Sequence, residues 1–292
     1  MISVQRGNRE TTMNRLILGS LLAWLALAVQ TSGQTLNSVE ISLQGPAKFV
    51  VSDPVGRTTG VDPIKAKSYS DIPGATYGTG GADSEDPNTP GFVTEEFGCT
   101  GPVNGTYTLR VIGMELGSFE LYVVLYRGVT AGRDFKFIGV TTRGQEIEYS
   151  FDYWRDTSKA LVATKLVRSS SLSEDLSNCY KLKLLGQREL YSDLSHRVDK
   201  FEKYLSHRDS LEARHELLKL KEKIDDVYKK SEKRVDKKKP VRREFISEDA
   251  YKILDEDIAS LLQQLPEHRK GKGWEKRDEK GNKEKGKGKG RD

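Results

Sequence analysis

Residues 106–126 read TYTLRVIGMELGSFELYVVLY and determine the fold class of the first half of this chain. Apolar and polar side chains alternate through TYTLRVIG (106–113) and again through SFELYVVLY (118–126), and a glycine stands at each end of the short link. Alternation with period two, in segments rich in Val, Tyr, Phe and Thr, is typical of strands with one buried face. The stretch therefore predicts two β-strands joined by a turn.

Four more segments on either side show the same alternation. They are SVEISL (38–43), KFVVS (48–52), FKFIGV (135–140) and EIEYSFDYW (146–154). Short strands separated by Gly-containing turns predict an antiparallel β-sandwich over residues 36–165. Its inward face is expected to include Leu109, Val111, Phe119, Leu121, Val123, Tyr149, Phe151 and Tyr153.

Residues 53–98 interrupt the strand pattern, because they are rich in Gly, Pro, Asp, Ser and Thr. A segment of this length exceeds an ordinary turn. We expect a long loop, which is either functional or carries small strands of its own.

The hydrophobic period becomes helical after Leu172. Residues 190–205 carry a stripe spaced by three and four, and Asp209-Ser210 opens a further helix. Ser247 is a good N-cap for a last helix, which Pro266 ends. Three or four helices with short links predict an antiparallel helical bundle over residues 170–265. The expected fold class is α+β, with the sandwich and the bundle as separate domains.

The N-terminus has the layout of a secretory signal peptide within residues 1–33. The sequence MNRLILGSLLAWLALAVQTSG (13–33) places Arg15 before an apolar run of 14 residues, Leu16 to Val29, and small and polar residues follow. The natural start is expected at Met13, with cleavage after Ala28 or Gly33. A run this short favours a cleaved signal over an uncleaved anchor or a buried core helix. We therefore expect a secreted or extracytoplasmic protein (periplasm or cell surface) with no transmembrane span in the mature chain.

The net charge of +5 comes from the C-terminal tail. Residues 266–292 hold 11 Lys or Arg and 6 Asp or Glu, a net of +5 that equals the charge of the whole chain. Because this Lys/Gly-rich segment contains one aromatic residue, Trp274, and no aliphatic residue, we expect it to be disordered. It serves either to solvate the chain or to contact anionic polymers. The near-neutral remainder predicts no specific nucleic-acid site.

Two cysteines, Cys99 and Cys179, allow one disulfide in an oxidising compartment. The alternative is two separate buried thiols, because sequence alone cannot bring the two Cα atoms together.

Two motifs in the first half resemble a module of uncharacterised secreted bacterial proteins. They are DPVGRTTGVDP (53–63) and IPGATYG (72–78), followed by an acidic Asp/Pro loop and a Gly-initiated strand at 105–111. Residues 245–265 resemble the last helix of the helical module that often follows it. The resemblance implies an extracytoplasmic sandwich-plus-bundle protein and supplies no activity and no catalytic residues. The cationic tail and the KKKPVRR stretch (237–243) depart from that family.

Weak site candidates lie in the 53–98 segment. Asp83, Glu85 and Asp86 offer carboxylates to Ca²⁺, although their spacing matches no EF-hand, and a solvated polar loop is the simpler interpretation. Arg57 and Asp62 either stabilise a turn, as an ion pair or by hydrogen bonds to its backbone, or contact a ligand. The sequence predicts no cofactor other than this Ca²⁺ candidate.

The function that these patterns favour is that of a non-catalytic structural or interaction protein, since no nucleophile, acid/base or metal-ligand motif stands out. Its partner would be a protein or a glycan of the cell envelope. The first alternative is an extracytoplasmic carbohydrate- or ligand-binding module that uses residues 53–98. An extracellular hydrolase is the third class, and it would need a convergent pair of catalytic groups.

Overall fold

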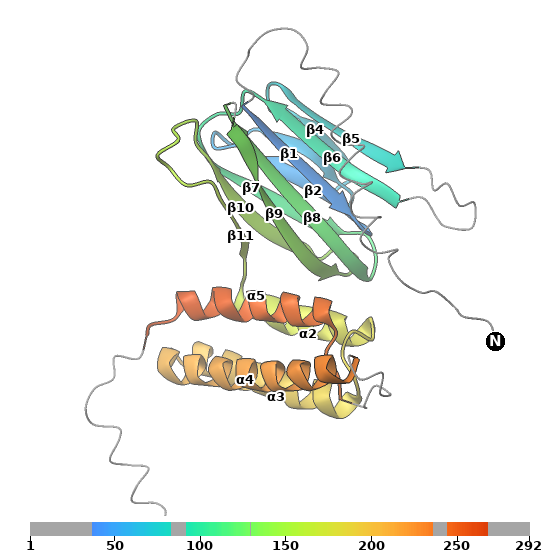
Figure 1. Ribbon diagram of the computed structural model, residues 1–292, viewed down its shortest axis with the longest axis vertical. Coiled ribbons are helices and arrows are strands. Elements are labelled where there is room, and N and C mark those ends of the chain that lie inside the picture. The colour runs from blue at the N-terminus through green and yellow to red at the C-terminus, as the bar shows by residue number, and fades with distance from the viewer. Residues whose placement is uncertain (1–36, 83–91, 129, 236–243, 268–292) are drawn as a thin grey trace, which may run out of the picture.

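The computed structural model describes residues 37–82, 92–128, 130–235 and 244–267. They form two antiparallel sheets and four helices, a mixed α+β architecture (Figure 1). The five-stranded sheet has the order β5-β6-β1-β8-β9, and the six-stranded sheet has the order β11-β10-β7-β2-β3-β4. The strands are β1 (Ser38–Gln44), β2 (Ala47–Ser52), β3 (Thr58–Asp62), β4 (Lys67–Ser70), β5 (Ala75–Ala82), β6 (Phe92–Thr100), β7 (Gly105–Gly113), β8 (Gly117–Arg127), β9 (Thr130–Thr141), β10 (Glu146–Tyr153) and β11 (Val162–Leu166).

The segment 106–126 supplies one strand to each sheet. β7 belongs to the six-stranded sheet and β8 to the five-stranded sheet, so their link passes from one sheet to the other. Gly113 fits at the start of this link because a Cβ there would lie 2.1 Å from Thr141 Oγ1. The two strands face one another across a shared core, and the eight side chains predicted to point inward are all buried. All six strands predicted from alternation are confirmed.

The expectation of a long loop over residues 53–98 is wrong, and its alternative of small strands holds. This segment contains β3, β4, β5 and most of β6. β4 and β5 are edge strands whose sequences, KSYS and ATYGTGGA, contain few apolar side chains, so they show no alternation. Gly60 lies in β3 with a φ of +133°, a conformation that other residues rarely adopt. The sequence pattern also missed β11, a five-residue edge strand.

Four helices follow the sheets along the described part of the chain. They are α2 (Ser169–Lys181), α3 (Arg188–Ser206), α4 (Ser210–Val235) and α5 (Glu248–Gln264). The predicted N-cap of the last helix is confirmed, because the Ala250 amide donates to Ser247 Oγ at 3.2 Å. The apolar stripes of all four helices meet in a second buried cluster.

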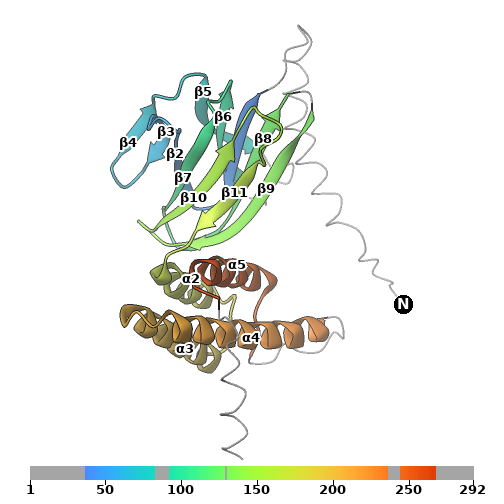
Figure 2. The same ribbon diagram turned by 90° about the vertical axis from the view of Figure 1, so that its left-hand side faces the viewer.

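The helices pack directly against one end of the sheets. Figures 1 and 2 show α2 and α5 next to the strands, with α3 and α4 on their far side. α2 and α5 both contact β9, and α5 also contacts β11. Val140 of β9 is fully buried and belongs to the helical core. The chain therefore has two cores that meet at a common boundary.

Among the described residues, no helix combines the length and the apolar character needed to cross a membrane. The apolar run Leu16–Val29 and the tail from residue 268 lie outside the described residues, so the expectations for them stay predictions.

Candidate functional site

The first Asp-Pro pair of the segment 53–63 builds the turn between β2 and β3. One carboxylate oxygen of Asp53 accepts hydrogen bonds from the backbone amides of Val55 (3.0 Å) and Arg57 (2.9 Å). The other oxygen accepts from Arg57 Nε at 2.7 Å. Proline after an aspartate that bonds to the following backbone is a common turn-forming combination. Arg57 is thus held by its own turn.

The second Asp-Pro pair builds the turn between β3 and β4 in the same way. Asp62 Oδ1 accepts from the amides of Ile64 (3.2 Å) and Lys65 (3.0 Å). Asp62 Oδ2 accepts from Arg110 Nη2 at 3.0 Å and lies 3.2 Å from Lys65 Nζ. The side chain of Asp62 is fully buried, so these groups replace its water shell.

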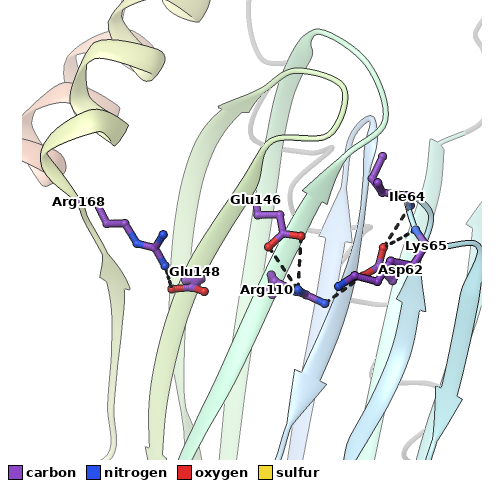
Figure 3. Close-up of polar contacts among 7 residues, drawn as sticks. All are labelled: Asp62, Ile64, Lys65, Arg110, Glu146, Glu148 and Arg168. Carbon is purple, nitrogen blue, oxygen red and sulfur yellow. Dashed lines mark hydrogen bonds and ion pairs between the residues drawn. The ribbon is translucent and has the colours of Figure 1, made fainter.

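Arg110 extends this contact across the outer face of the six-stranded sheet (Figure 3). Its Nη1 lies 3.3 Å from Glu146 Oε2 of β10. We name Lys65, Asp62, Arg110 and Glu146 the outer-face ladder. Beside it, Arg168 Nη2 donates to Glu148 Oε2 at 2.9 Å. The outer-face ladder therefore places charges of alternating sign on strands β3, β7 and β10. β7 and β10 are neighbours in the sheet, and β2 lies between β7 and β3.

The ladder changes the titration of Asp62. Burial by itself would raise the pKa of this carboxyl group. The backbone and side chain of Lys65 and the charge of Arg110 outweigh burial and hold the pKa below its ordinary value. Asp62 is therefore ionised at neutral pH, which makes it the fixed negative charge between Lys65 and Arg110.

The two predicted turn residues have separate partners. Arg57 pairs with Asp53 and Asp62 pairs with Arg110 and Lys65, so the two residues are not an ion pair with one another. Asp62 accepts hydrogen bonds from the turn amides of Ile64 and Lys65, and Arg57 donates to the Asp53 carboxylate from its amide and from Nε. Whether either residue contacts a ligand stays a prediction.

The Ca²⁺ candidates Asp83, Glu85 and Asp86 lie outside the described residues, so their role stays a prediction. Within the described ranges, no group of three or more His, Cys, Asp and Glu side chains could hold a metal ion.

Of the two alternatives for Cys99 and Cys179, a disulfide or two separate thiols, the structure has the second, because both cysteines are free, buried thiols. Cys99 lies on β6 and packs in the core between the sheets, whereas Cys179 lies on α2 and packs in the helical core. Burial is the main cause that raises the pKa of each thiol. Each cysteine thus acts as a small apolar side chain in its own core.

A second cluster of charges lies at the boundary between sheets and helices. Lys165 of β11 is 2.8 Å from Asp175 Oδ2 of α2 and 2.5 Å from Asp257 Oδ1 of α5. None of the three side chains is more than 1% exposed. We name Lys165, Asp175 and Asp257 the junction network. It connects β11 and α2, which are consecutive in the chain, with α5, whose Asp257 lies 92 positions beyond Lys165.

The sequence held a weak signal for the junction network that the pattern analysis missed. Lys165 lies two residues after Ala163 on β11, so both side chains point to the same face of the strand, and Ala163 packs against the sheet core. Asp257 follows Ile253 and Leu254 on the apolar stripe of α5, and Asp175 precedes Leu176 on that of α2. A charged residue in phase with a buried stripe is rare unless it is paired. A charged residue at a buried position of a strand or helix therefore indicates a partner of opposite charge in the interior of the protein.

Comparisons with protein families, with curated proteins and with solved structures find no match for this chain. The outer-face ladder and the junction network are therefore the features on which a functional proposal rests.

Proposed function

We propose that this chain is a secreted or cell-surface, non-catalytic protein with a structural or interaction role. The apolar run Leu16–Val29 behind Arg15 supports export. In this proposal residues 36–165 act as a β-sandwich domain and residues 170–265 as a helical-bundle domain. The Lys/Gly-rich tail, residues 266–292, then meets anionic polymers outside the cytoplasm.

The outer-face ladder is the observation that carries the interaction role. Its charges are paired with one another across β3, β7 and β10, so they are held in fixed positions on an open sheet face. Exposed hydroxyl groups of Thr106 and Thr108 stand on the same face of β7. A fixed array of charges and hydroxyls favours a polar partner, such as a protein or a glycan of the cell envelope.

The alternative of ligand binding by residues 53–98 through Arg57 and Asp62 has less support. Arg57 is bound to Asp53 within its own turn, and both carboxylate oxygens of Asp62 are bound, one to turn amides and the other to Arg110 of β7. A ligand would have to displace these contacts.

Photo-crosslinking tests the interaction role. A photoreactive amino acid replaces Thr108 in the centre of the proposed face, and the matched control replaces Lys136 on the other sheet, where β9 is exposed. In cells that export the protein, we expect a discrete adduct from position 108 and none from position 136. Adducts at both positions or only at 136 would contradict the proposed face.

Cell fractionation tests the location separately. We expect the intact chain in the extracytoplasmic fraction and a chain lacking residues 13–33 in the cytoplasm. Equal distribution of the two chains would contradict export.

A further inference from the structure

We propose that Lys165 and Asp257 form an intramolecular isopeptide bond, an amide between Nζ and the side-chain carbonyl carbon, with Asp175 as the proton-transfer group. The geometry already brings Nζ to 2.5 Å from Asp257 Oδ1 and to 2.8 Å from Asp175 Oδ2. The nucleophile, the electrophile and a base are thus within hydrogen-bond distance before any bond forms.

The balance of protons in this network fits the reaction. Two carboxyl groups and one amine are buried together, so two carboxylates beside one ammonium would leave an excess negative charge without water. Burial, followed by the charge of Asp175, raises the pKa of Asp257, which therefore keeps its proton. Burial would lower the pKa of Lys165, but the two acidic neighbours outweigh it. Charge balance calls for one carboxylate beside the ammonium, and in the proposal that carboxylate is Asp175.

The second oxygen of Asp257 supports the choice of Asp257 as the electrophile. Asp257 Oδ2 is buried and no donor in the described residues reaches it, and a hydrogen bond between the Asp257 and Asp175 side chains helps to raise the pKa of Asp257, as expected for a protonated carboxyl group beside Asp175. Asp175, by contrast, receives a further hydrogen bond on its other oxygen from Gln145 Nε2 at 3.4 Å. In the proposal, the protonated oxygen of Asp257 is the group that leaves as water.

The reaction proceeds in two steps that balance. The Asp175 carboxylate takes a proton from the Lys165 ammonium, and the nitrogen lone pair attacks Cγ of Asp257, which forms the C–N bond and moves the carbonyl electron pair to oxygen. Asp175 then gives its proton to the departing hydroxyl and accepts the second nitrogen proton as the C–O bond breaks. One water molecule leaves, Asp175 ends as a neutral acid, and no oxidant or cofactor is required.

The buried site favours this product. The reaction replaces a buried ammonium and a buried carboxylate by a neutral amide and a neutral acid, which removes charges that are costly to keep away from water. The surrounding apolar packing excludes the water that would hydrolyse the amide. The bond would connect β11 to α5 across 92 positions of sequence and fix the helices to the sheets.

Peptide mapping tests the proposal on the intact wild-type chain, so it does not depend on the folding of a variant. Trypsin does not cleave after an acylated lysine, and residues 160–168 are therefore expected to be joined to residues 253–269 in one species. Its mass should equal the sum of the two peptides less one water molecule, with fragment ions that place the bond at Asp257. Cleavage after Lys165 and a separate, unmodified peptide 253–269 would overturn the proposal.

Three variants assign the roles. Lys165→Arg and Asp175→Asn are each expected to abolish the joined species. The matched control Asp255→Asn changes an acidic residue in the same peptide, which pairs with Lys221, and should retain it. A joined species in Asp175→Asn would overturn the role of Asp175, and its loss in Asp255→Asn would overturn the assignment of the bond to Asp257.

Discussion

The junction network and the outer-face ladder use the same kinds of side chain in opposite surroundings. In the junction network all three ionisable side chains are buried, so each depends on the other two. The ladder begins at buried Asp62 but ends at Glu146, whose side chain is 41% exposed. Water can replace a lost partner at the exposed end and not at the junction. The comparison indicates that the first network holds the architecture together, whereas the second shapes a surface.

The largest effect is expected from Lys165→Met. This change removes the side chain that contacts both buried carboxyl groups. Breaking a buried pair in this way costs about 3–5 kcal/mol, and loss of the proposed amide adds to that cost. Urea denaturation measures the free energy of unfolding. The matched control Lys136→Met removes an exposed pair with Glu120 and should cost about 1 kcal/mol or less. Equal losses in the two variants would show that burial does not distinguish the networks.

A smaller loss is expected from Asp62→Ala, at the buried end of the ladder. The change leaves two turn amides and Arg110 without their acceptor, and hydrogen bonds to a charged group are worth about 1.5–3 kcal/mol. Thermal unfolding of this variant beside Glu146→Ala compares the two ends of one ladder. If Glu146→Ala lowers the unfolding free energy more than Asp62→Ala does, the idea that buried contacts of the ladder contribute more than exposed ones is contradicted.

The pH dependence of the same site provides a third comparison. Since the pKa of Asp62 is lower in the folded chain than in the unfolded chain, its stabilisation is complete above the unfolded value, about 3.9, and is lost as pH falls through the folded value. The difference in unfolding free energy between wild type and Asp62→Asn should thus be largest near neutral pH and shrink in acid. A difference that grows in acid would reverse the sign of the assigned pKa shift.

The smallest effect is expected from Glu148→Gln, which removes the contact with Arg168. The Arg168 side chain is 71% exposed, so the loss should be about 1 kcal/mol or less. High salt should reduce it further, because the Debye length falls to about 3 Å at 1 M. Melting temperatures at low and high salt measure this. If the fall in melting temperature is unchanged in high salt, the contact between Glu148 and Arg168 behaves like a buried pair, which would contradict this prediction.

The sequence predicted elements whose side chains repeat with a clear period. The alternation in β7 and β8 and the apolar stripe of α5 each follow from one buried face, and the structure confirms them. β4 and β5 escaped prediction because edge strands bury little, and their Gly and Ser residues resemble those of a loop. A strand or helix can therefore be predicted from its sequence when one of its faces is buried, and it is missed when most of its side chains are exposed.

The candidate site was predictable only where its contacts are local. Asp62 bonds to backbone amides within three residues, so the turn motif could indicate such a role, whereas Asp53, which makes the equivalent contacts in the first turn, was not singled out from the sequence. Arg110 lies 48 positions from Asp62, and Lys165 lies 92 positions from Asp257. Such partners depend on strand order and helix packing, which no local spacing encodes. The sequence could not decide between a disulfide and two thiols for the same reason, because each cysteine belongs to a different core.

Hydrogen exchange of the native protein tests most directly whether the junction network makes the sheets and helices one cooperative unit. The most protected amides of β10 and α5 should open with the same free energy in the wild type, and Lys165→Met should lower both by the same amount. Loss of protection in α5 alone, with β10 unchanged from wild type, would contradict the account.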